Sequence, residues 1–393
     1  MKRLFECSVC GSKEGKEIFS IKNYPAYLVP LPVDYAAKVI KADLPLYACS
    51  TCGHMQVPEP DQEVQKKIYE EYYNYYVVDS SEALISHYRK PFENFIAKLV
   101  HEKKIMNGNL LELGCSSGEK VEFFSSFSKS YTGIDPSHRI QLAAKKFPKH
   151  TFIQGYFPEA LPPSLFDTIV TQFNLEHIEK VAEFISNIYK VSNENGMLII
   201  QVPDAAHFER TAQPNFLAHE HIQYFTKETL SFLLLKNGFK PIYWGEEGPS
   251  LILAAVKTEP NAALDYSTNK LALQHAQKQA LLFNTHPVLP EKPMIFYGVG
   301  PQLFWLLSQY NGNLNDIEVI DDNINYHQQG LPGYNKVIQP LSKKLVREKK
   351  YIVLSLNKIY HTQVLEKIRA LNEPCEVLVN TQENKWNIIN FSG

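Results

Sequence analysis

The feature that most constrains this chain is a short apolar segment that runs into two glycines, at residues 109–118. Its leucines predict a buried strand, and Gly114 and Gly118 enclose a turn that leads into a helix expected over 119–127. Glycine is needed in such a turn because the backbone passes close to a ligand, where a Cβ atom would collide. The free N–H groups at the start of the helix point at the turn, so an anionic or polar group can dock there.

The next predicted strand bears on what this turn does. Alone, a G-x-x-x-G turn indicates a plain connection between strand and helix as readily as a cofactor loop. Residues 131–134 predict a second strand, which ends in Asp135. An acidic side chain at that position can accept hydrogen bonds from the two hydroxyls of a ribose. The two features together favour a nucleoside cofactor, and a nicotinamide site is the alternative, although it prefers tighter glycine spacing.

Strand and helix patterns alternate through the following residues. Strands are expected at 152–154, 166–171 and 196–203, helices at 140–146, 181–191 and 226–237, and a closing hairpin at 241–256. This order predicts an α/β fold with a doubly wound, mainly parallel sheet and an antiparallel edge. Ligands of such sheets bind beyond the carboxyl ends of the strands. The side chains expected at that edge include Gln154, Gly155, Tyr156, Gln172 and Asn174.

Four of the six cysteines fall into two C-x-x-C pairs. Cys7 and Cys10 form the first pair, and Cys49 and Cys52 form the second. Two such pairs supply the four tetrahedral thiolates that Zn²⁺ prefers, and four thiolates leave no open position for water, which indicates a structural site. The alternatives are free cysteines or two disulfides, and disulfides are disfavoured in a chain without a secretion signal.

The length and composition set the broad class of protein. The chain has 393 residues, enough for two to three domains, with 44% hydrophobic and 21% charged residues and a formal net charge of −2. This balance indicates a folded protein without electrostatic bias toward nucleic acid or a membrane. There is no apolar run of ~18 residues and no apolar signal core at the start, so we expect a cytoplasmic enzyme without a membrane segment.

Four parts are expected along the chain. They are a zinc-binding domain at 1–75, the sheet domain at 76–257, a helical connector at 258–285 and a second, smaller Rossmann-like domain at 286–393. The last part begins with a strand and the sequence Gly298-Val299-Gly300, but Leu303 stands where a third glycine is expected. A dinucleotide site is therefore not expected in this domain.

The segment between the cysteines and the glycine turn is rich in tyrosine. Residues 68–76 contain five tyrosines, of which several share one face at helical spacing. One interpretation is an aromatic face that joins the small domain to the large one. The other is that one or two phenols line a substrate cleft as hydrogen-bond donors. For any single tyrosine the sequence favours the first interpretation.

Three titratable side chains follow one another at His219-Glu220-His221, in a loop after the fifth predicted strand of the sheet domain. A carboxylate beside an imidazole can hold its tautomer and raise its basicity. We favour an acid–base role over a solvated loop or a transition-metal site. The metal site is disfavoured because neighbouring residues seldom point the same way and no third ligand is evident. His177, at the tip of the fourth strand, is a weaker candidate for proton transfer.

The turn and the second strand tip resemble the motif of class I S-adenosylmethionine-dependent methyltransferases. Their E-x-G-x-x-x-G pattern, followed by an acidic residue at the end of strand two, is matched by Glu112, Gly114, Gly118 and Asp135. The resemblance covers about residues 85–257 and implies S-adenosylmethionine as the cofactor. The residues then expected to bind it are Glu112, Gly114, Cys115, Ser116, Gly118, Asp135, Gln154, Gly155, Tyr156, Gln172 and Asn174.

The whole chain resembles the sugar C-methyltransferases that act on dTDP- or GDP-linked keto-deoxysugars. That family has a four-cysteine zinc ribbon, a central class I domain and a cofactor-free Rossmann-like C-terminal domain. The metal ligands implied are Cys7, Cys10, Cys49 and Cys52, and the H-E-H loop matches residues 219–221. Residues 321–322 and 331–333 resemble C-terminal segments of the family. Where the family often has a tyrosine two residues before the glutamate, this chain has Ala218.

This resemblance implies methylation of a carbon beside a ketone, through an enolate. His221, oriented by Glu220, would remove the α-proton, and the donor to the enolate oxygen would be Tyr73, Tyr75, Tyr76 or His177. The implied substrate is a nucleotide sugar, whose diphosphate the C-terminal domain would help to hold. Two alternatives remain: an O- or N-methyltransferase acting on a small molecule, which needs no enolate, and a non-catalytic binding module that retains the fold.

Overall fold

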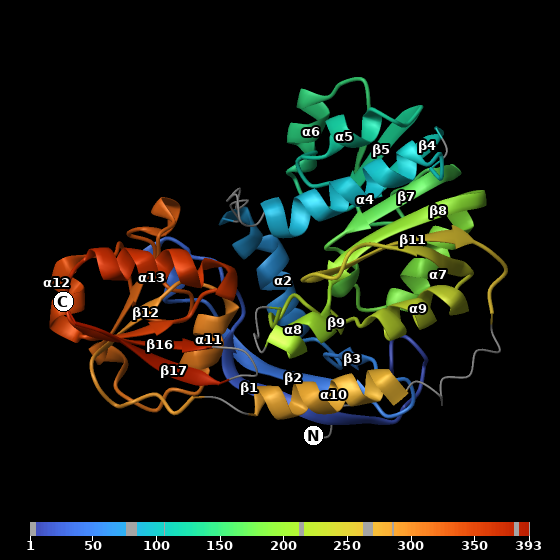
Figure 1. Ribbon diagram of the computed structural model, residues 1–393. Helices are drawn as coiled ribbons and strands as arrows, with labels where there is room; N and C mark the ends of the chain where they lie inside the picture. The colour runs from blue at the N-terminus through green and yellow to red at the C-terminus, as the bar shows by residue number, and fades with distance from the viewer. Residues whose placement is uncertain are drawn as a thin grey trace.

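The computed structural model of the chain describes residues 5–75, 85–105, 107–211, 216–261, 270–284, 287–380 and 385–392. Its strands form three sheets of four, seven and six strands. The seven-stranded sheet and the six-stranded sheet lie at opposite ends of the molecule, and the four-stranded sheet runs along the base that connects them (Figure 1). No helix within the described ranges is long and apolar enough to cross a bilayer.

The central sheet confirms the predicted doubly wound arrangement. Its strands run in the order β10-β11-β8-β7-β4-β5-β6, with β8 to β6 parallel and β10 and β11 antiparallel. The strands are β4 (Asn109–Leu113), β5 (Ser130–Asp135), β6 (Thr151–Gln154), β7 (Phe166–Gln172), β8 (Ser192–Pro203), β10 (Phe239–Trp244) and β11 (Ser250–Lys257).

Helices cover both faces of this sheet because successive residues of a buried strand point to opposite sides. Leu110 packs with α4 and α5 on one face, and the next residue, Leu111, packs with α7 and α9 on the other. The helices of this part are α4 (Lys90–His101), α5 (Val121–Ser125), α6 (Ile140–Lys146), α7 (Val181–Val191) and α9 (Lys227–Lys236). A π-helical turn (η2, Ile85–Arg89) precedes α4, and a 3₁₀ turn (η3, Leu175–His177) follows β7.

The N-terminal sheet includes a strand from the part of the chain that forms the central sheet. It consists of β1 (Gly15–Pro25), β2 (Lys41–Cys49), β3 (Met55–Gln56) and β9 (Gln223–Tyr224), in that order. Near it lie α1 (Val33–Ala36), α2 (Gln62–Glu70) and the 3₁₀ turn η1 (Tyr72–Tyr75). Because β9 directly follows the His219–His221 loop, this loop is anchored to the N-terminal sheet.

The third sheet has the order β14-β13-β12-β15-β16-β17, and only the edge strand β17 is antiparallel to its neighbour. The strands are β12 (Met294–Tyr297), β13 (Ile317–Ile320), β14 (Ile338–Gln339), β15 (Tyr351–Leu354), β16 (Cys375–Asn380) and β17 (Trp386–Phe391). The helical elements are α11 (Pro301–Ser308), α12 (Lys343–Lys349), α13 (His361–Ala370) and the 3₁₀ turns η4 (Leu314–Asp316), η5 (Ile324–Tyr326) and η6 (Lys358–Tyr360).

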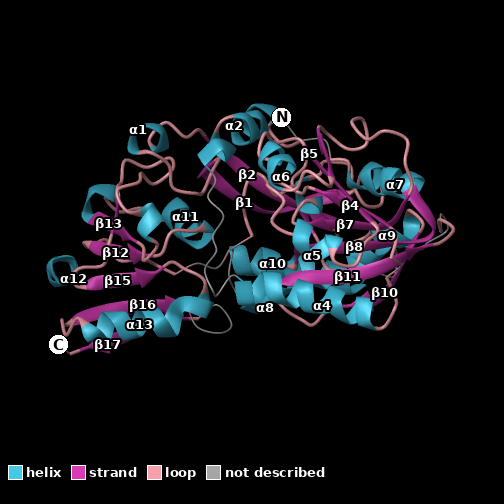
Figure 2. Ribbon diagram, turned by 90° about the horizontal axis from the view of Figure 1, so that it is seen from above, coloured by secondary structure: helices cyan, strands magenta, loops and turns pink. Residues whose placement is uncertain are grey.

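One hydrophobic cluster joins the N-terminal and C-terminal sheets. Ile21 and Tyr24 of β1 belong to the same buried cluster as Phe304 and Trp305 of α11. The Tyr24 hydroxyl lies 3.3 Å from the carbonyl oxygens of Leu217 and Pro301. Two further helices, α8 (Ala205–Thr211) and α10 (Lys270–Phe283), lie side by side near this junction (Figure 2).

One predicted helix is longer than the helix observed. The helix expected over 119–127 is shortened to α5, because Ser116 and Gly118 have φ angles of 47° and 77° and the chain needs further residues to reach helical angles. The first N–H groups of this helix therefore do not follow the turn directly. Of the helical connector expected at 258–285, the structure describes α10 from Lys270 onward, and residues 262–269 lie outside the described residues.

Candidate functional site

The glycine turn after β4 has the backbone shape that its sequence predicts. Gly114 and Gly118 have φ angles of 83° and 77°, which glycine adopts without strain. A Cβ atom on Gly118 would lie 2.8 Å from the Cβ of Ala143 in α6, so a side chain does not fit there. A Cβ atom on Gly114 would lie 3.4 Å from Asn174, which places the turn next to the residues that follow β7.

Asp135 fastens this turn to the tip of β5. Its carboxylate is buried and accepts hydrogen bonds from the backbone N–H of Ser116 at 2.9 Å and from the N–H and hydroxyl of Ser137 at 2.9 and 2.5 Å. A carboxylate offers about four acceptor positions, so one remains for a ribose hydroxyl. The sequence predicts a ligand contact for Asp135, and the structure adds a role in holding the loop that would surround the ligand.

We expect the Asp135→Ala variant to bind S-adenosylhomocysteine about 10- to 100-fold more weakly than the wild type, because three donors lose a charged acceptor. Isothermal titration calorimetry measures this. Asp167→Ala is the matched control, since its carboxylate accepts from the Asn109 N–H and from Asn193 at the opposite, amino-terminal edge of the sheet. Equal losses of affinity in the two variants would contradict a local role for Asp135.

Glu112 lies beneath the turn rather than in it. Its carboxyl is buried and accepts a hydrogen bond of 2.5 Å from the Tyr131 hydroxyl. Burial raises the pKa of Glu112 to about 7. Cys115 is also buried, so only its backbone borders the turn. These two residues were predicted to bind the cofactor, and their side chains face the interior of the sheet.

A lysine that sequence reasoning missed lies at the same edge. Lys120 donates a hydrogen bond to the side chain of Gln172, whose amide nitrogen donates to Gln201 at 2.7 Å. Burial lowers the pKa of Lys120. The signal in the sequence was its position six residues after Gly114, just before α5. The lysine places a positive charge next to the predicted cofactor residues of β7.

The other predicted cofactor residues also lie along the carboxyl edge. Gln154, at the end of β6, pairs with His138 at 3.0 Å, and the amide of Asn174 donates to Thr171 at 3.1 Å. Tyr156 is 70% exposed, and Gly155 directly precedes it. The structure thus brings the tips of β4, β5, β6 and β7 to one edge of the sheet, as the sequence predicted.

The four cysteines of the two C-x-x-C pairs converge. The sulfurs of Cys7, Cys10, Cys49 and Cys52 all lie within 4.8 Å of one another, and none is in a disulfide. The closest pairs are Cys10–Cys49 at 3.5 Å and Cys7–Cys52 at 3.6 Å. Tetrahedral zinc with Zn–S bonds of about 2.3 Å needs sulfurs about 3.8 Å apart. The donor set and its spacing therefore fit a zinc ion.

The rings of His177 and His221 lie edge to face, with centroids 5.0 Å apart. The Nδ1 atom of His221 lies 2.6 Å from the carbonyl oxygen of Phe216, and that of His177 lies 2.9 Å from the carbonyl oxygen of Glu220. A carbonyl only accepts, so both Nδ1 atoms carry a proton. In a neutral ring of this tautomer the Nε2 atom presents a lone pair. Burial lowers the pKa of His177 to about 3, so this ring stays neutral.

The structure assigns different partners to the other two residues of the loop. The backbone carbonyl of Phe216, not the side chain of Glu220, orients His221. The Glu220 carboxylate instead interacts with the phenol of Tyr73. His219 is buried and its Nε2 atom lies 3.2 Å from the carbonyl oxygen of Tyr24, so it anchors the loop to β1. Sequence adjacency suggested one cluster, but alternate residues of the loop point to different neighbours.

Only part of the tyrosine segment can be placed. Tyr72 is buried against Tyr27 within the N-terminal part, and Tyr73 stacks on Tyr69 with ring centroids 5.2 Å apart. Burial, and after it the charge of Glu220, raise the pKa of the Tyr73 phenol, so it stays protonated and able to donate. Tyr76 and the side chain of Tyr75 lie outside the described residues.

Glu176 completes a cluster that the sequence did not predict. One of its carboxyl oxygens lies 3.9 Å from the Nε2 atom of His177, and ligand atoms of Glu176, His177 and His221 lie within 4.8 Å of one another. The carboxyl is 1% exposed, and its Oε2 atom has no hydrogen-bond partner among the described residues. Burial raises the pKa of Glu176 to about 8, so the group is neutral near pH 7.

This raised pKa predicts a pH-dependent stability. Glu176 stays protonated in the folded state but ionises in the unfolded state above its usual pKa, so its contribution is complete at low pH and is lost as the pH rises toward 8. Between those values the free energy of unfolding should fall by about 1.4 kcal/mol per pH unit from this group. In urea denaturation at several pH values, Glu176→Gln should lack this slope and the exposed control Glu183→Gln should keep it. If the free energy of unfolding of the wild type and of Glu176→Gln changed with pH in the same way, the raised pKa of Glu176 would be contradicted.

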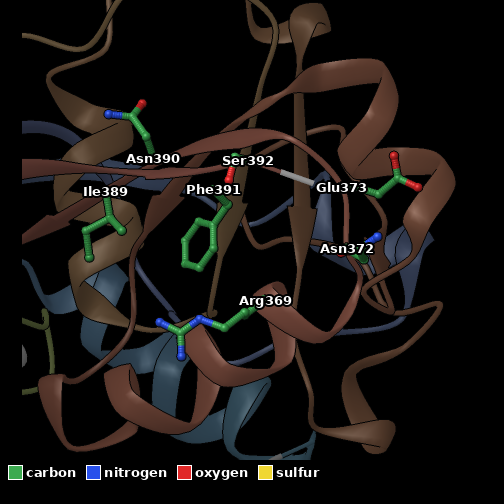
Figure 3. Close-up of a pocket in the computed structure, with 7 residues that line it drawn as sticks. All are labelled: Arg369, Asn372, Glu373, Ile389, Asn390, Phe391 and Ser392. Atoms are coloured by element: carbon green, nitrogen blue, oxygen red, sulfur yellow. The ribbon is translucent and has the colours of Figure 1, made fainter.

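A shallow pocket of about 310 Å³ lies on the third sheet, away from these residues. Figure 3 shows the Arg369 side chain of α13 pointing toward the ring of Phe391 in β17, and the guanidinium carbon lies 5.7 Å from the ring centroid. None of the site residues predicted from the sequence lines this pocket. It is therefore separate from the edge where the predicted cofactor residues meet.

Comparisons with known proteins agree with this site. A family model described as a methyltransferase domain matches residues 84–243. The chain is 23% identical over 247 residues to the C-methyltransferase NovU of Streptomyces niveus, which covers 60% of this chain and 56% of NovU. It is 24% identical over 116 residues to the mitochondrial ubiquinone biosynthesis O-methyltransferase of Schizosaccharomyces pombe, covering 27% of this chain and 42% of that protein. The chain thus spans about half the length of these curated relatives.

Similar solved structures include two with bound S-adenosylhomocysteine. The magnesium protoporphyrin IX methyltransferase ChlM of Synechocystis has 16% identity and a TM-score of 0.40, covering 50% of this chain and 100% of that one. The N-methyltransferase NodS of Bradyrhizobium japonicum has 17% identity and a TM-score of 0.39, and the match covers 49% of this chain and 98% of NodS.

The central sheet with its glycine turn is a class I methyltransferase fold of Rossmann-like type. Residues 84–243 match the model of a methyltransferase domain, and they contain the glycine turn and Asp135.

Proposed function

We propose that this chain is an S-adenosylmethionine-dependent C-methyltransferase. In this proposal it methylates a carbon next to the ketone of a nucleotide-linked keto-deoxysugar, through an enolate. The observation that carries the proposal is the pair of imidazoles, His177 and His221, which both carry a proton on Nδ1 and lie with ring centroids 5.0 Å apart at the carboxyl edge of the central sheet. The similarity to a C-methyltransferase supports the same class of reaction.

S-adenosylmethionine supplies an electrophilic methyl group when it is bound. The residues that would hold it are the glycine turn, Asp135 and the side chains at the tips of β6 and β7. The buried carboxylate of Asp135 would accept from the ribose, and the φ angles of Gly114 and Gly118 let the backbone approach the ligand.

His221 would act as the general base. Its Nδ1–H is held by the Phe216 carbonyl, which leaves the Nε2 lone pair to remove the α-proton from the carbon beside the ketone. The electron pair of the C–H bond would become the enolate and would then bond to the methyl carbon, while the carbon–sulfur bond of the sulfonium breaks and its electron pair stays on sulfur. His177 carries its proton on Nδ1, which the Glu220 carbonyl holds. The donor to the enolate oxygen would therefore be the Tyr73 phenol, which would exchange its interaction with the Glu220 carboxylate for one with the substrate.

The four cysteines would hold a structural zinc ion. Four thiolates leave no position for substrate or water, so the ion would stabilise the N-terminal part rather than take part in the reaction. The C-terminal domain would help to bind the nucleotide diphosphate of the substrate.

Deuterium exchange tests the enolate directly. The protein is incubated in D₂O with S-adenosylhomocysteine and a dTDP- or GDP-linked keto-deoxysugar, and deuterium at the carbon beside the ketone is measured by mass spectrometry. With S-adenosylhomocysteine we expect deuterium exchange without methyl transfer. When S-adenosylmethionine replaces S-adenosylhomocysteine, we expect a C-methylated sugar. Methyl transfer to oxygen or nitrogen without exchange would contradict the proposal. Absence of S-adenosylmethionine binding by calorimetry would indicate a non-catalytic binding module.

A further inference from the structure

Gln223 lies where the cysteine pairs and the two histidine segments meet. It begins β9, is 2% exposed, and follows His221 by two residues. Its register partner in β3 is Gln56, so its backbone is fixed to the N-terminal sheet (Figure 1). Buried amides of this kind need all their hydrogen bonds, because an unpaired one costs stability.

The side-chain amide of Gln223 makes four hydrogen bonds. Its oxygen accepts from the Ser8 hydroxyl at 2.7 Å and from the His54 ring at 2.8 Å. Its nitrogen donates to the carbonyl oxygens of Ile178 at 2.9 Å and Glu179 at 3.1 Å. This uses both acceptor and both donor positions of the amide, so its orientation is fixed.

The partners on the two sides belong to different functional segments. Ser8 lies between Cys7 and Cys10, and His54 follows Cys52 by two residues. On the other side, Ile178 and Glu179 directly follow His177. The Gln223 amide therefore links both cysteine pairs to the segment that follows His177. The strand of Gln223 itself continues the segment that contains His221.

We propose that Gln223 is a positioning residue that couples the four-cysteine metal site to the His177–His221 pair; this rests on the proposed function of that pair. In this view the metal is required for turnover although it takes no part in the reaction. It holds Ser8 and His54, these hold the Gln223 oxygen, and the Gln223 nitrogen holds the backbone that carries His177. Loss of the Gln223 amide or of the metal lets the two imidazoles move apart.

The test compares Gln223→Leu with Gln56→Leu. Gln56 is the control, because it is a buried glutamine paired with Gln223 in the sheet. Its oxygen accepts from the Ser8 backbone N–H, and its amide nitrogen donates to the Glu6 carbonyl and not to the histidine segments. We expect Gln223→Leu to keep one zinc per chain and its affinity for S-adenosylhomocysteine. Its kcat should fall about 10- to 100-fold with KM nearly unchanged, as for a small displacement of reacting groups, while Gln56→Leu stays within about threefold.

A spectroscopic measurement makes the result independent of turnover. In the wild type, ¹⁵N NMR of the histidine side chains should show His177 and His221 protonated at Nδ1. Gln223→Leu, and wild type stripped of zinc by a chelator, should both show mixed tautomers at His177. If Gln223→Leu does not fold, Gln223→Glu replaces it, since it keeps the oxygen acceptor and loses only the donors to Ile178 and Glu179.

The outcomes separate this proposal from the proposed function. Wild-type tautomers in both the variant and the zinc-stripped protein would overturn the coupling, whatever the enzyme does. Tautomers altered as expected, in a protein that shows no deuterium exchange with any keto-sugar, would support the coupling and overturn the proposed reaction. Equal losses of kcat in the Gln56 and Gln223 variants would also overturn the specific role of Gln223.

Discussion

The His221→Asn variant is expected to lose about 10²- to 10⁴-fold in kcat for methyl transfer, the usual contribution of a general base. An asparagine amide can still donate to the Phe216 carbonyl, as the Nδ1–H of His221 does, but it has no basic nitrogen. The loop should therefore keep its position while the proton acceptor is removed. Deuterium exchange at the carbon beside the ketone should fall in parallel with kcat, because both need the same proton transfer.

Binding and a second histidine provide the controls for this variant. The affinity for S-adenosylhomocysteine should be unchanged, since the glycine turn and Asp135 do not contact His221 in any hydrogen bond of the structure's described residues. His101→Asn, at the exposed end of α4, should have wild-type activity. Unchanged turnover in His221→Asn would remove His221 from the reaction, and lost exchange with retained methyl transfer would point to an O- or N-methyltransferase.

A comparison of His219 with His221 shows what the sequence could not provide. Both histidines flank the same glutamate, and spacing alone gives them similar roles. In the structure His219 is buried against the Tyr24 carbonyl, 195 residues away, while His221 faces His177. This difference depends on the contact between β1 and the loop, which no local pattern encodes. For the same reason the orienting group of His221 is a backbone carbonyl, which has no signature in a sequence.

The features that could be predicted are those that local geometry determines. Gly114 and Gly118 need positive φ angles, and the alternation of strands and helices requires their tips to meet at one edge. Glu176 was missed because a glutamate in a short turn after a strand is usually exposed. Here the loop that ends at Ile222 packs over it and buries it. The N–H of Ile222 donates to the Glu176 carbonyl at 2.7 Å. Likewise β9 is two residues long and exists only because β3 lies beside it.

The Cys49→Ser variant is expected to lose the metal and most of the stability of the N-terminal part. A structural zinc site contributes on the order of 10 kcal/mol in small zinc-binding peptides, which is comparable with the whole free energy of unfolding of a domain. The effect should extend beyond this part, since Cys7, Cys49 and Cys52 belong to the same buried cluster as Leu175 and Phe225 of the methyltransferase domain. Zinc analysis and thermal denaturation followed by circular dichroism measure both losses.

Cys375→Ser is the matched control, because Cys375 is a single buried cysteine in β16 of the third sheet. It should keep one zinc per chain and lose only the packing of one sulfur, about 1 kcal/mol. A Cys49→Ser protein with full zinc content and an unchanged melting temperature would exclude the four-cysteine metal site. If the variant loses zinc but keeps wild-type histidine tautomers, the four cysteines bind the metal, but the metal does not position His177 and His221. Leu175 shares the buried cluster of the cysteines and lies two residues before His177. We therefore expect the loss of zinc to alter the histidine tautomers as well.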